Sequence, residues 1–159
     1  MRYQPEPKHT TRRWQRGLTV LVLATLLVAG FASQAGGDCR SLRPLLDALH
    51  MVESSGRLSP DPGDGGRALG PYQIWRVYWT DALEHAPELG GQYQDVCIRA
   101  YAEWVMVAYW SRYCPRAIET MDYRTLAVTH HLGPHPDRRP ARAKAYWRKV
   151  QAALKANTD

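Results

Sequence analysis

Residues 96–113 read VCIRAYAEWVMVAYWSRY and form the strongest periodic stretch of the chain. Apolar and aromatic side chains recur there at spacings of three and four, which is the pattern of one helix face. The side chains expected to share that face are Cys97, Tyr101, Trp104, Val105, Ala108, Tyr109 and Arg112. We therefore predict a central buried helix over this stretch, ended by Pro115.

Four more helices are predicted around it, from apolar spacing and from residues that start and stop helices. They cover 40–53, Tyr72 to about Leu83, Tyr123 to about His131, and 141–156. Asp122 is placed to N-cap the third of these, and Gly133-Pro134 to close it. Residues 54–70 instead carry turn residues almost throughout, so we expect a small hairpin region at 56–70. The predicted fold class is mainly α: a helical bundle around a central buried helix, with a small β-hairpin or loop region.

The first 37 residues are set apart from the rest of the chain. Three arginines within residues 12–16 precede an apolar run from Leu18 to Ala32, and the small residues Ser33-Gln34-Ala35 follow. This order is typical of a secretory signal. The apolar run is shorter than the roughly 18 residues of a confident membrane span, and an uncleaved anchor is the alternative. We predict an exported protein, secreted or periplasmic, with residues 1–37 as signal peptide or membrane anchor and 38–159 as one domain.

The net charge of +6 is unevenly distributed along the chain. Residues 135–159 hold seven Lys and Arg and two Asp, whereas 36–134 hold nine basic and twelve acidic residues. Such polarity suits binding to an acidic polymer such as an anionic cell wall; a solvated basic last helix is the alternative. No recognition motif accompanies the charge, so nucleic acid is not an expected partner.

Glu53 stands where the apolar face of the predicted helix 40–53 would continue, four residues after Leu49. Burial there would disfavour its charged form and raise its pKa. Glycosidic bond cleavage needs such an acid, still protonated near neutral pH, together with a second carboxylate. Asp61 and Asp64 both lie in the polar stretch that follows. If the helix end frays instead, Glu53 turns to solvent.

Several runs of residues resemble invertebrate-type lysozymes. Val52-Glu53-Ser54-Ser55-Gly56 is similar to the Glu-Ser-Gly of that family. Asp64-Gly65-Gly66, leading into Gly70-Pro71-Tyr72-Gln73-Ile74, is similar to its Asp-x-Gly followed by Gly-Pro-Phe-Gln-Ile. Tyr78-Trp79-Thr80-Asp81, the run from Tyr109 to Tyr113, and Tyr146-Trp147 continue the likeness in the same order, over about residues 40–150. A Glu-Ser followed by Ala-x-Gly-x-x-Gln also resembles bacterial lytic transglycosylases, so the chain is identified as a member of the lysozyme-like superfamily.

Carried over by position, the resemblance implies that Glu53 is the catalytic acid. It implies that Asp64, rather than Asp61, is the second carboxylate. Tyr72 and Gln73 match a stretch that lines the cleft in lysozyme-like enzymes, so both are expected to contact substrate; packing of the helix start is the alternative. His130 is a further expected contact, since His130-His131-Leu132-Gly133-Pro134 stands where the family has His-Asn-Gly-Gly-Pro.

Metal and cofactor sites are not expected. His130 and His131 are adjacent and therefore point to different helix faces. No Cys or carboxylate pattern completes a tetrahedral set with them.

The three cysteines of the chain, Cys39, Cys97 and Cys114, allow at most one intramolecular bridge. A helix over 98–113 would hold Cys97 and Cys114 about 25 Å apart, too far for a disulfide. Cys39 is therefore expected to bond to one of them, and the resemblance favours Cys114, because the comparable helix end of the family is tied by a disulfide. The cysteine-rich framework of that family is otherwise missing.

The function implied is that of a glycoside hydrolase, a muramidase that cleaves the β-1,4 glycan backbone of peptidoglycan. Glu53 would be the general acid, and Asp64 the nucleophile, the electrostatic stabiliser or the group that positions water. One alternative is a lytic transglycosylase in which Glu53 acts alone. Another is a non-catalytic glycan-binding module on the same scaffold. Chitin is the alternative substrate, and a monomer is expected.

Overall fold

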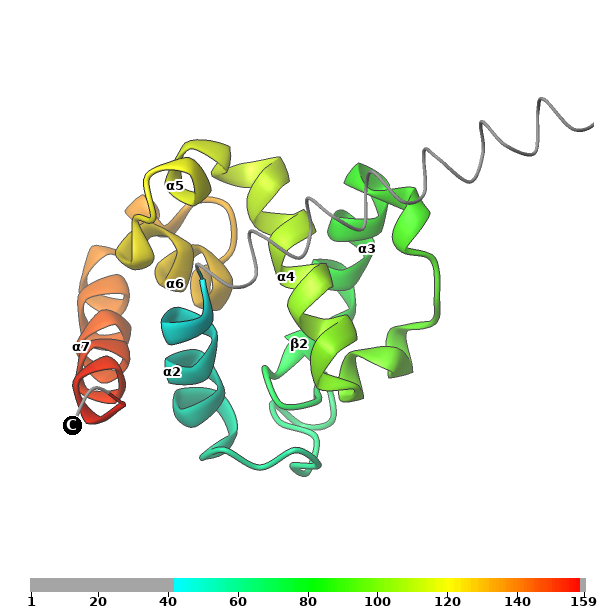
Figure 1. Cartoon of the computed structure of the whole chain (residues 1–159), viewed down its shortest axis with the longest axis horizontal. Helices are drawn as coiled ribbons and strands as arrows, with labels where there is room; N and C mark the ends of the chain where they lie inside the picture. Colours follow the sequence, from blue (N-terminus) through cyan, green and yellow to red (C-terminus); the bar gives the residue numbers. More distant parts are fainter. Residues whose placement is uncertain (1–41, 158–159) are drawn as a thin grey trace, which may run out of the picture. The chain divides into compact units, whose positions relative to one another are not determined.

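The computed structural model describes residues 42–157, which form a mainly helical domain with one small antiparallel hairpin (Figure 1). The helices are α2 (Arg43–Ser54), α3 (Arg76–His85), α4 (Arg99–Tyr113), α5 (Pro115–Glu119), α6 (Tyr123–Leu132) and α7 (Pro140–Ala156). Short 3-10 turns lie at η1 (Pro87–Leu89), η2 (Tyr93–Cys97) and η3 (Pro136–Arg138). The predicted fold class is confirmed.

The predicted signal or anchor, residues 1–37, lies outside the described residues. Between residues 42 and 157 no helix has the length and apolar character that crossing a bilayer requires.

Helix α4 packs against α3, η2, α5 and α6, as expected of a central helix. Its buried face differs from the predicted one, because Trp104 is 49% exposed and Cys97 is also exposed. Consecutive residues on an α-helix are about 100° apart, so with Ala102 and Met106 turned inward, Trp104 between them points outward. The buried residues of α4 are Ala102, Glu103, Val105, Met106, Ala108, Tyr109 and Trp110.

Helices α2, α6 and α7 pack beside one another on the other side of the domain from α3 (Figure 1). Helix α2 is more deeply buried than α7. Its residues Leu45, Leu46 and Leu49 have no exposed surface. The start of α6 is fixed as predicted: the Asp122 carboxylate accepts the backbone N–H of Thr125. The helix ends at Leu132, one residue before Gly133. This packing brings the C-terminal turn of α2 close to α6 and α7.

The hairpin lies further along the chain than the predicted region at 56–70. Strand β1 (Ala68–Leu69) pairs with β2 (Ile74–Trp75), and Gly63 bridges to Ala68. The predicted helix start at Tyr72 is therefore wrong, because residues 74–75 are strand and α3 begins at Arg76. The turn between the strands depends on Gly70 and Gln73, which both have positive φ angles. At Gly70 a Cβ atom would lie 2.1 Å from the Val96 carbonyl oxygen, so only glycine fits.

A buried carboxylate ties α2 to α4. Glu103 is 6% exposed and accepts hydrogen bonds from both terminal nitrogens of Arg43 at 2.7 Å. Arg99 donates to it at 3.0 Å and the Tyr72 hydroxyl at 2.6 Å. Burial alone would raise the pKa of Glu103, but these donors outweigh it and lower the pKa. The cluster also anchors the segment before β2, because Tyr72 belongs to that segment.

Candidate functional site

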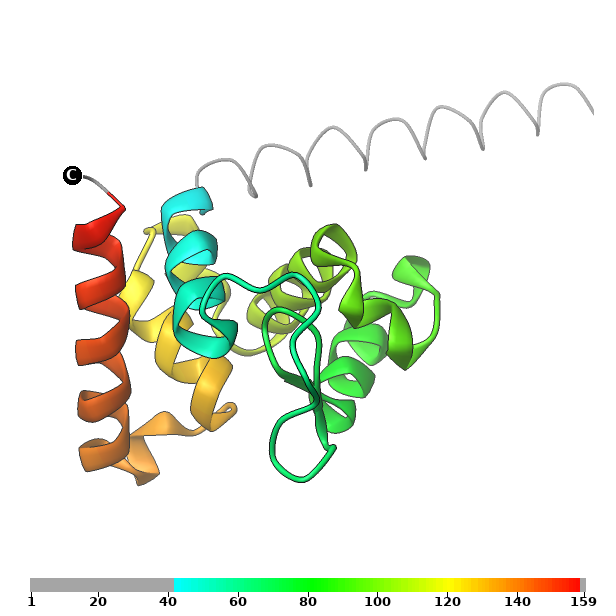
Figure 2. The ribbon, with the colours of Figure 1, turned by 90° about the horizontal axis from the view of Figure 1, so that it is seen from below.

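A cleft of about 650 Å³ runs between the hairpin and the connection from α6 to α7. In Figure 2 the hairpin and this connection reach the same edge of the domain, with the end of α2 between them. The lining residues are Glu53, Gly63, Asp64, Arg67, Gln73, Ile74, Trp75, Val77, Tyr78, Tyr109, His130, His131, Leu132, Gly133, Arg139 and Arg142. The cleft therefore combines two carboxyl groups, several aromatic rings and three arginines.

Glu53 lies in the last turn of α2 and opens into this cleft. Its side chain is 15% exposed, and its Oε1 accepts a hydrogen bond of 2.5 Å from the Tyr146 hydroxyl on α7. Burial raises the pKa of Glu53, and the charge of Asp64 raises it further; the Tyr146 hydrogen bond and Lys149 act in the opposite direction. The net pKa is raised, so Glu53 keeps its proton to higher pH than an exposed glutamate does.

Asp64 reaches the same cleft from the exposed loop before β1. Its backbone has a φ of 51°, and its Oδ2 accepts a 2.9 Å hydrogen bond from Trp75 Nε1. Asp61, three residues earlier, is not among the cleft-lining residues; its carbonyl lies 3.5 Å from Gln73 Nε2. The structure thus brings Glu53 together with Asp64 and leaves Asp61 outside.

Gln73 and His130, two of the three expected substrate contacts, line the cleft. Gln73 is half-buried, and its Nε2 donates to the Gly70 carbonyl at 3.0 Å. His130 is buried, with Nε2 at 3.2 Å from the Tyr72 carbonyl and Nδ1 at 3.5 Å from the Tyr78 hydroxyl. Burial lowers the pKa of His130 to about 4, so the ring is neutral at physiological pH. The residue surface of His130 is only 9% exposed, so little of it is open to the cleft.

Tyr72, the third expected contact, is placed elsewhere. Its side chain has no exposed surface and does not line the cleft. The hydroxyl donates to Glu103, and the ring lies 5.7 Å from the ring of His50, centre to centre. Tyr72 therefore packs the core beneath the hairpin, because Glu103 supplies the buried acceptor that its hydroxyl requires.

Tyr146 and His131 are site residues that sequence reasoning missed. The two rings stack with centres 4.0 Å apart and planes 3° apart, and His131 Nδ1 lies 3.9 Å from Glu53 Oε1. Burial lowers the pKa of His131, and the neighbouring charges of Arg142 and Lys149 lower it further. Tyr146 lies 93 positions from Glu53, so only the tertiary fold reveals the pair. The likeness at Tyr146-Trp147 was the one available sequence signal.

Cys97 and Cys114 flank α4 at its two ends, and both are free thiols in the described part of the chain. Cys39, the expected partner of one of them, lies outside the described residues, so that disulfide stays a prediction. Between residues 42 and 157 no cluster of three or more His, Cys, Asp and Glu side chains could hold a metal ion.

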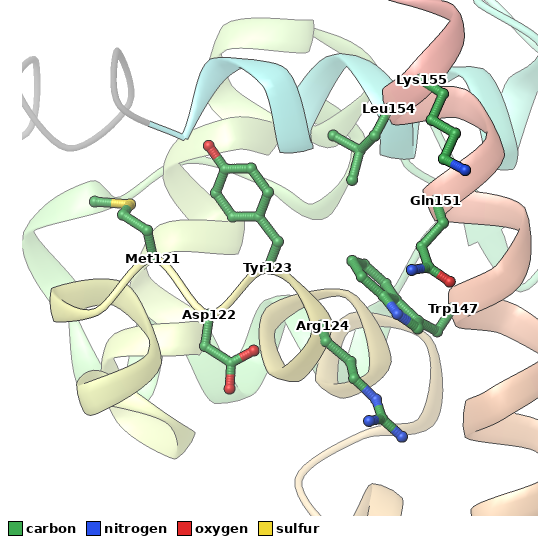
Figure 3. A pocket seen from close by; sticks show the side chains of 8 residues that line it. All are labelled: Met121, Asp122, Tyr123, Arg124, Trp147, Gln151, Leu154 and Lys155. Atoms are coloured by element: carbon green, nitrogen blue, oxygen red, sulfur yellow. The ribbon is translucent and has the colours of Figure 1, made fainter.

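A second, shallower hollow of about 450 Å³ lies between the start of α6 and the end of α7 (Figure 3). Met121, Tyr123, Trp147 and Leu154 give it an apolar floor. Its one carboxylate, Asp122, is occupied as the helix cap, since Thr125 donates both N–H and hydroxyl to it. The hollow therefore lacks the paired carboxyl groups of the cleft.

No protein-family model matches this chain, and a search of curated proteins found no relative.

Proposed function

We propose that this chain is a glycoside hydrolase that cleaves the β-1,4 glycan backbone of peptidoglycan, between N-acetylmuramic acid and N-acetylglucosamine. One observation carries the proposal: a half-buried Glu53 with a raised pKa shares a cleft with the solvated carboxylate of Asp64. This is the division of labour that glycoside hydrolysis requires, one carboxyl group protonated and the other ionised. The likeness to invertebrate-type lysozymes assigns the same two residues.

Glu53 supplies the proton to the glycosidic oxygen. The Tyr146 hydroxyl donates to Oε1, and His131 Nδ1 lies 3.9 Å from the same oxygen. The proton of Glu53 is therefore expected on Oε2, which has no partner among the described residues. As the C–O bond breaks, that proton moves to the leaving oxygen and Glu53 becomes ionised. The Tyr146 hydroxyl then donates to an anionic carboxylate, and such a charge-assisted bond is stronger than a neutral one.

Asp64 faces the positive charge that develops on the sugar ring. It acts as nucleophile, as electrostatic stabiliser or as the group that orients the attacking water. Trp75 Nε1 holds one of its oxygens, which fixes the direction of the carboxylate. Trp75 lines the same cleft with 38% of its surface exposed, which suits stacking against a sugar face. Tyr78 and Tyr109 also line the cleft, but they are buried and stack on each other.

The test combines substitution with product analysis. Glu53→Gln keeps the side-chain shape but removes the proton donor, so turnover of purified peptidoglycan should fall by about 10²–10⁴-fold without loss of folding. Asp64→Asn should also impair turnover strongly. Asp61→Asn is the matched control, because it removes a carboxylate from the same loop but outside the cleft.

Mass spectrometry of the products separates the rival reactions. Reducing ends support the hydrolase. Anhydro ends, together with an Asp64→Asn variant that is still active, would contradict the hydrolase and identify a lytic transglycosylase. In that reaction Glu53 is both acid and base, and a sugar hydroxyl takes the place of water. Binding without any product would identify a glycan-binding module.

A further inference from the structure

Three arginines line the cleft, and they come from both of its sides. Arg67 comes from the hairpin side, and Arg139 and Arg142 from the start of α7. Arg67 is held in place, because its Nε donates to the Asp64 carbonyl at 2.9 Å and its guanidinium lies 4.8 Å from the centre of the Trp75 ring. These contacts leave its terminal nitrogens free of the described acceptors.

Arg139 and Arg142 form no ion pair with an acid in residues 42–157. Arg142 is nevertheless close to the reactive centre, since its charge lowers the pKa of His131, whose Nδ1 lies 3.9 Å from Glu53. The first turn of α7 contains no acidic residue. Cations at a helix N-terminus oppose the helix dipole, so helix stability does not account for these two arginines.

The charge balance of the cleft is positive when Glu53 holds its proton. Asp64 is the one other carboxyl group among the described lining residues, against three guanidinium groups. Guanidinium groups bind carboxylates through paired, charge-assisted hydrogen bonds. A neutral polysaccharide offers such groups only uncharged hydroxyl and carbonyl oxygens, which bind guanidinium more weakly than a carboxylate does.

We propose that Arg67, Arg139 and Arg142 form a carboxylate-recognition site that selects glycans carrying acidic substituents over neutral glycans such as chitin. This inference rests on the proposed function, because it names the substrate class of the same cleft. The carboxylates come from the lactyl group of N-acetylmuramic acid or from the peptide attached to it. Both sources offer the same group to the arginines, and the test separates them.

The experiment measures binding by calorimetry, using the full chain with Glu53→Gln so that no ligand is consumed. The ligands are a peptide-free tetrasaccharide of alternating N-acetylglucosamine and N-acetylmuramic acid, the same tetrasaccharide with its carboxyls amidated, chitotetraose, and a peptide-bearing muropeptide. We expect the acidic tetrasaccharide to bind about tenfold or more tightly than its amidated form. If the acidic and amidated tetrasaccharides bind equally and only the muropeptide binds more tightly than chitotetraose, the site stands and its ligand is the peptide carboxylate.

Adding Arg139→Gln and Arg142→Gln should remove most of the preference and leave chitotetraose binding unchanged. Arg148→Gln is the matched control, since this exposed arginine lies on α7 but does not line the cleft. Equal affinity for all four ligands, the muropeptide included, would overturn the proposal. An equal loss of affinity for acidic and neutral ligands in the double variant would also overturn it. Turnover is measured separately on the wild-type chain, so an inactive protein that keeps the preference refutes the hydrolase and not the carboxylate site.

Discussion

Two neighbouring side chains lie close to the same carboxylate oxygen of Glu53, Oε1. The Tyr146 hydroxyl donates to Oε1, and His131 stacks on the Tyr146 ring while its Nδ1 lies 3.9 Å from the same oxygen. Burial raises the pKa of Glu53, whereas the Tyr146 hydrogen bond favours the ionised form and limits that rise. The balance of these two effects sets the pH range over which the acid holds its proton.

Tyr146→Phe tests this balance. Without the hydroxyl, the ionised form of Glu53 loses a donor, so its pKa should rise further. The acid then stays protonated to higher pH, and the basic limb of the pH–rate profile should move to higher pH. The profile is measured on peptidoglycan, with Tyr113→Phe as the control, because Tyr113 lies on α4 and does not line the cleft. A limb that stays in place or moves to lower pH contradicts this assignment of Tyr146.

Five of the six helices in the described residues were predictable from sequence because each has a local cause, whereas α5 was not predicted and α3 begins later than predicted. Apolar spacing indicates α2 and α4, and the Asp122 cap and Gly133 bound α6. The hairpin was misplaced because its position depends on a distant contact: Gly70 packs against the Val96 carbonyl. Tyr72 was assigned to the cleft for a similar reason, since its acceptor Glu103 lies 31 positions away. Local patterns thus located the two carboxyl groups that share the cleft, Glu53 and Asp64, and missed Tyr146, which α7 contributes.

At the level of elements, Glu103→Gln tests the link between α2 and α4. The change weakens the bonds to Arg43 and Arg99 and removes one of their two counter-charges, because Asp47 also pairs with both arginines. Both arginines are partly solvent-exposed, so the free energy of unfolding should fall by about 1–3 kcal/mol, below the cost of breaking a fully buried pair. Urea denaturation measures the loss. Glu84→Gln is the control: its pair with Arg112 is on the surface, so a much smaller loss is expected. Equal losses in both variants would show that Glu103 does not tie the helices together.

Across the whole domain, the cleft is built on a buried histidine that joins two groups of helices. His130 on α6 donates to the carbonyl of Tyr72 and packs edge-on against Tyr78 of α3. Protonating this ring would place a charge where α6 meets α3 and the hairpin. Burial lowers the pKa of His130 from 6.5 to about 4, so the folded state binds its proton less readily than the unfolded state.

This difference makes global stability depend on pH. The stability that neutral His130 contributes is fully present above pH 6.5 and is lost as the pH falls from 6.5 towards 4, by roughly 1.4 kcal/mol for each pH unit at most. Glu53 acts in the opposite direction, because a raised carboxyl pKa favours the folded state at low pH.

A comparison between the wild type and a His130 variant therefore isolates the contribution of the histidine. His130→Gln keeps an amide donor for the Tyr72 carbonyl and cannot be protonated in this range. Its free energy of unfolding, measured by urea denaturation at several pH values, should fall less between pH 6.5 and 4 than that of the wild type. Parallel pH profiles would mean that His130 titrates in the folded protein as it does in the unfolded chain, and that the interface around it accepts the charge.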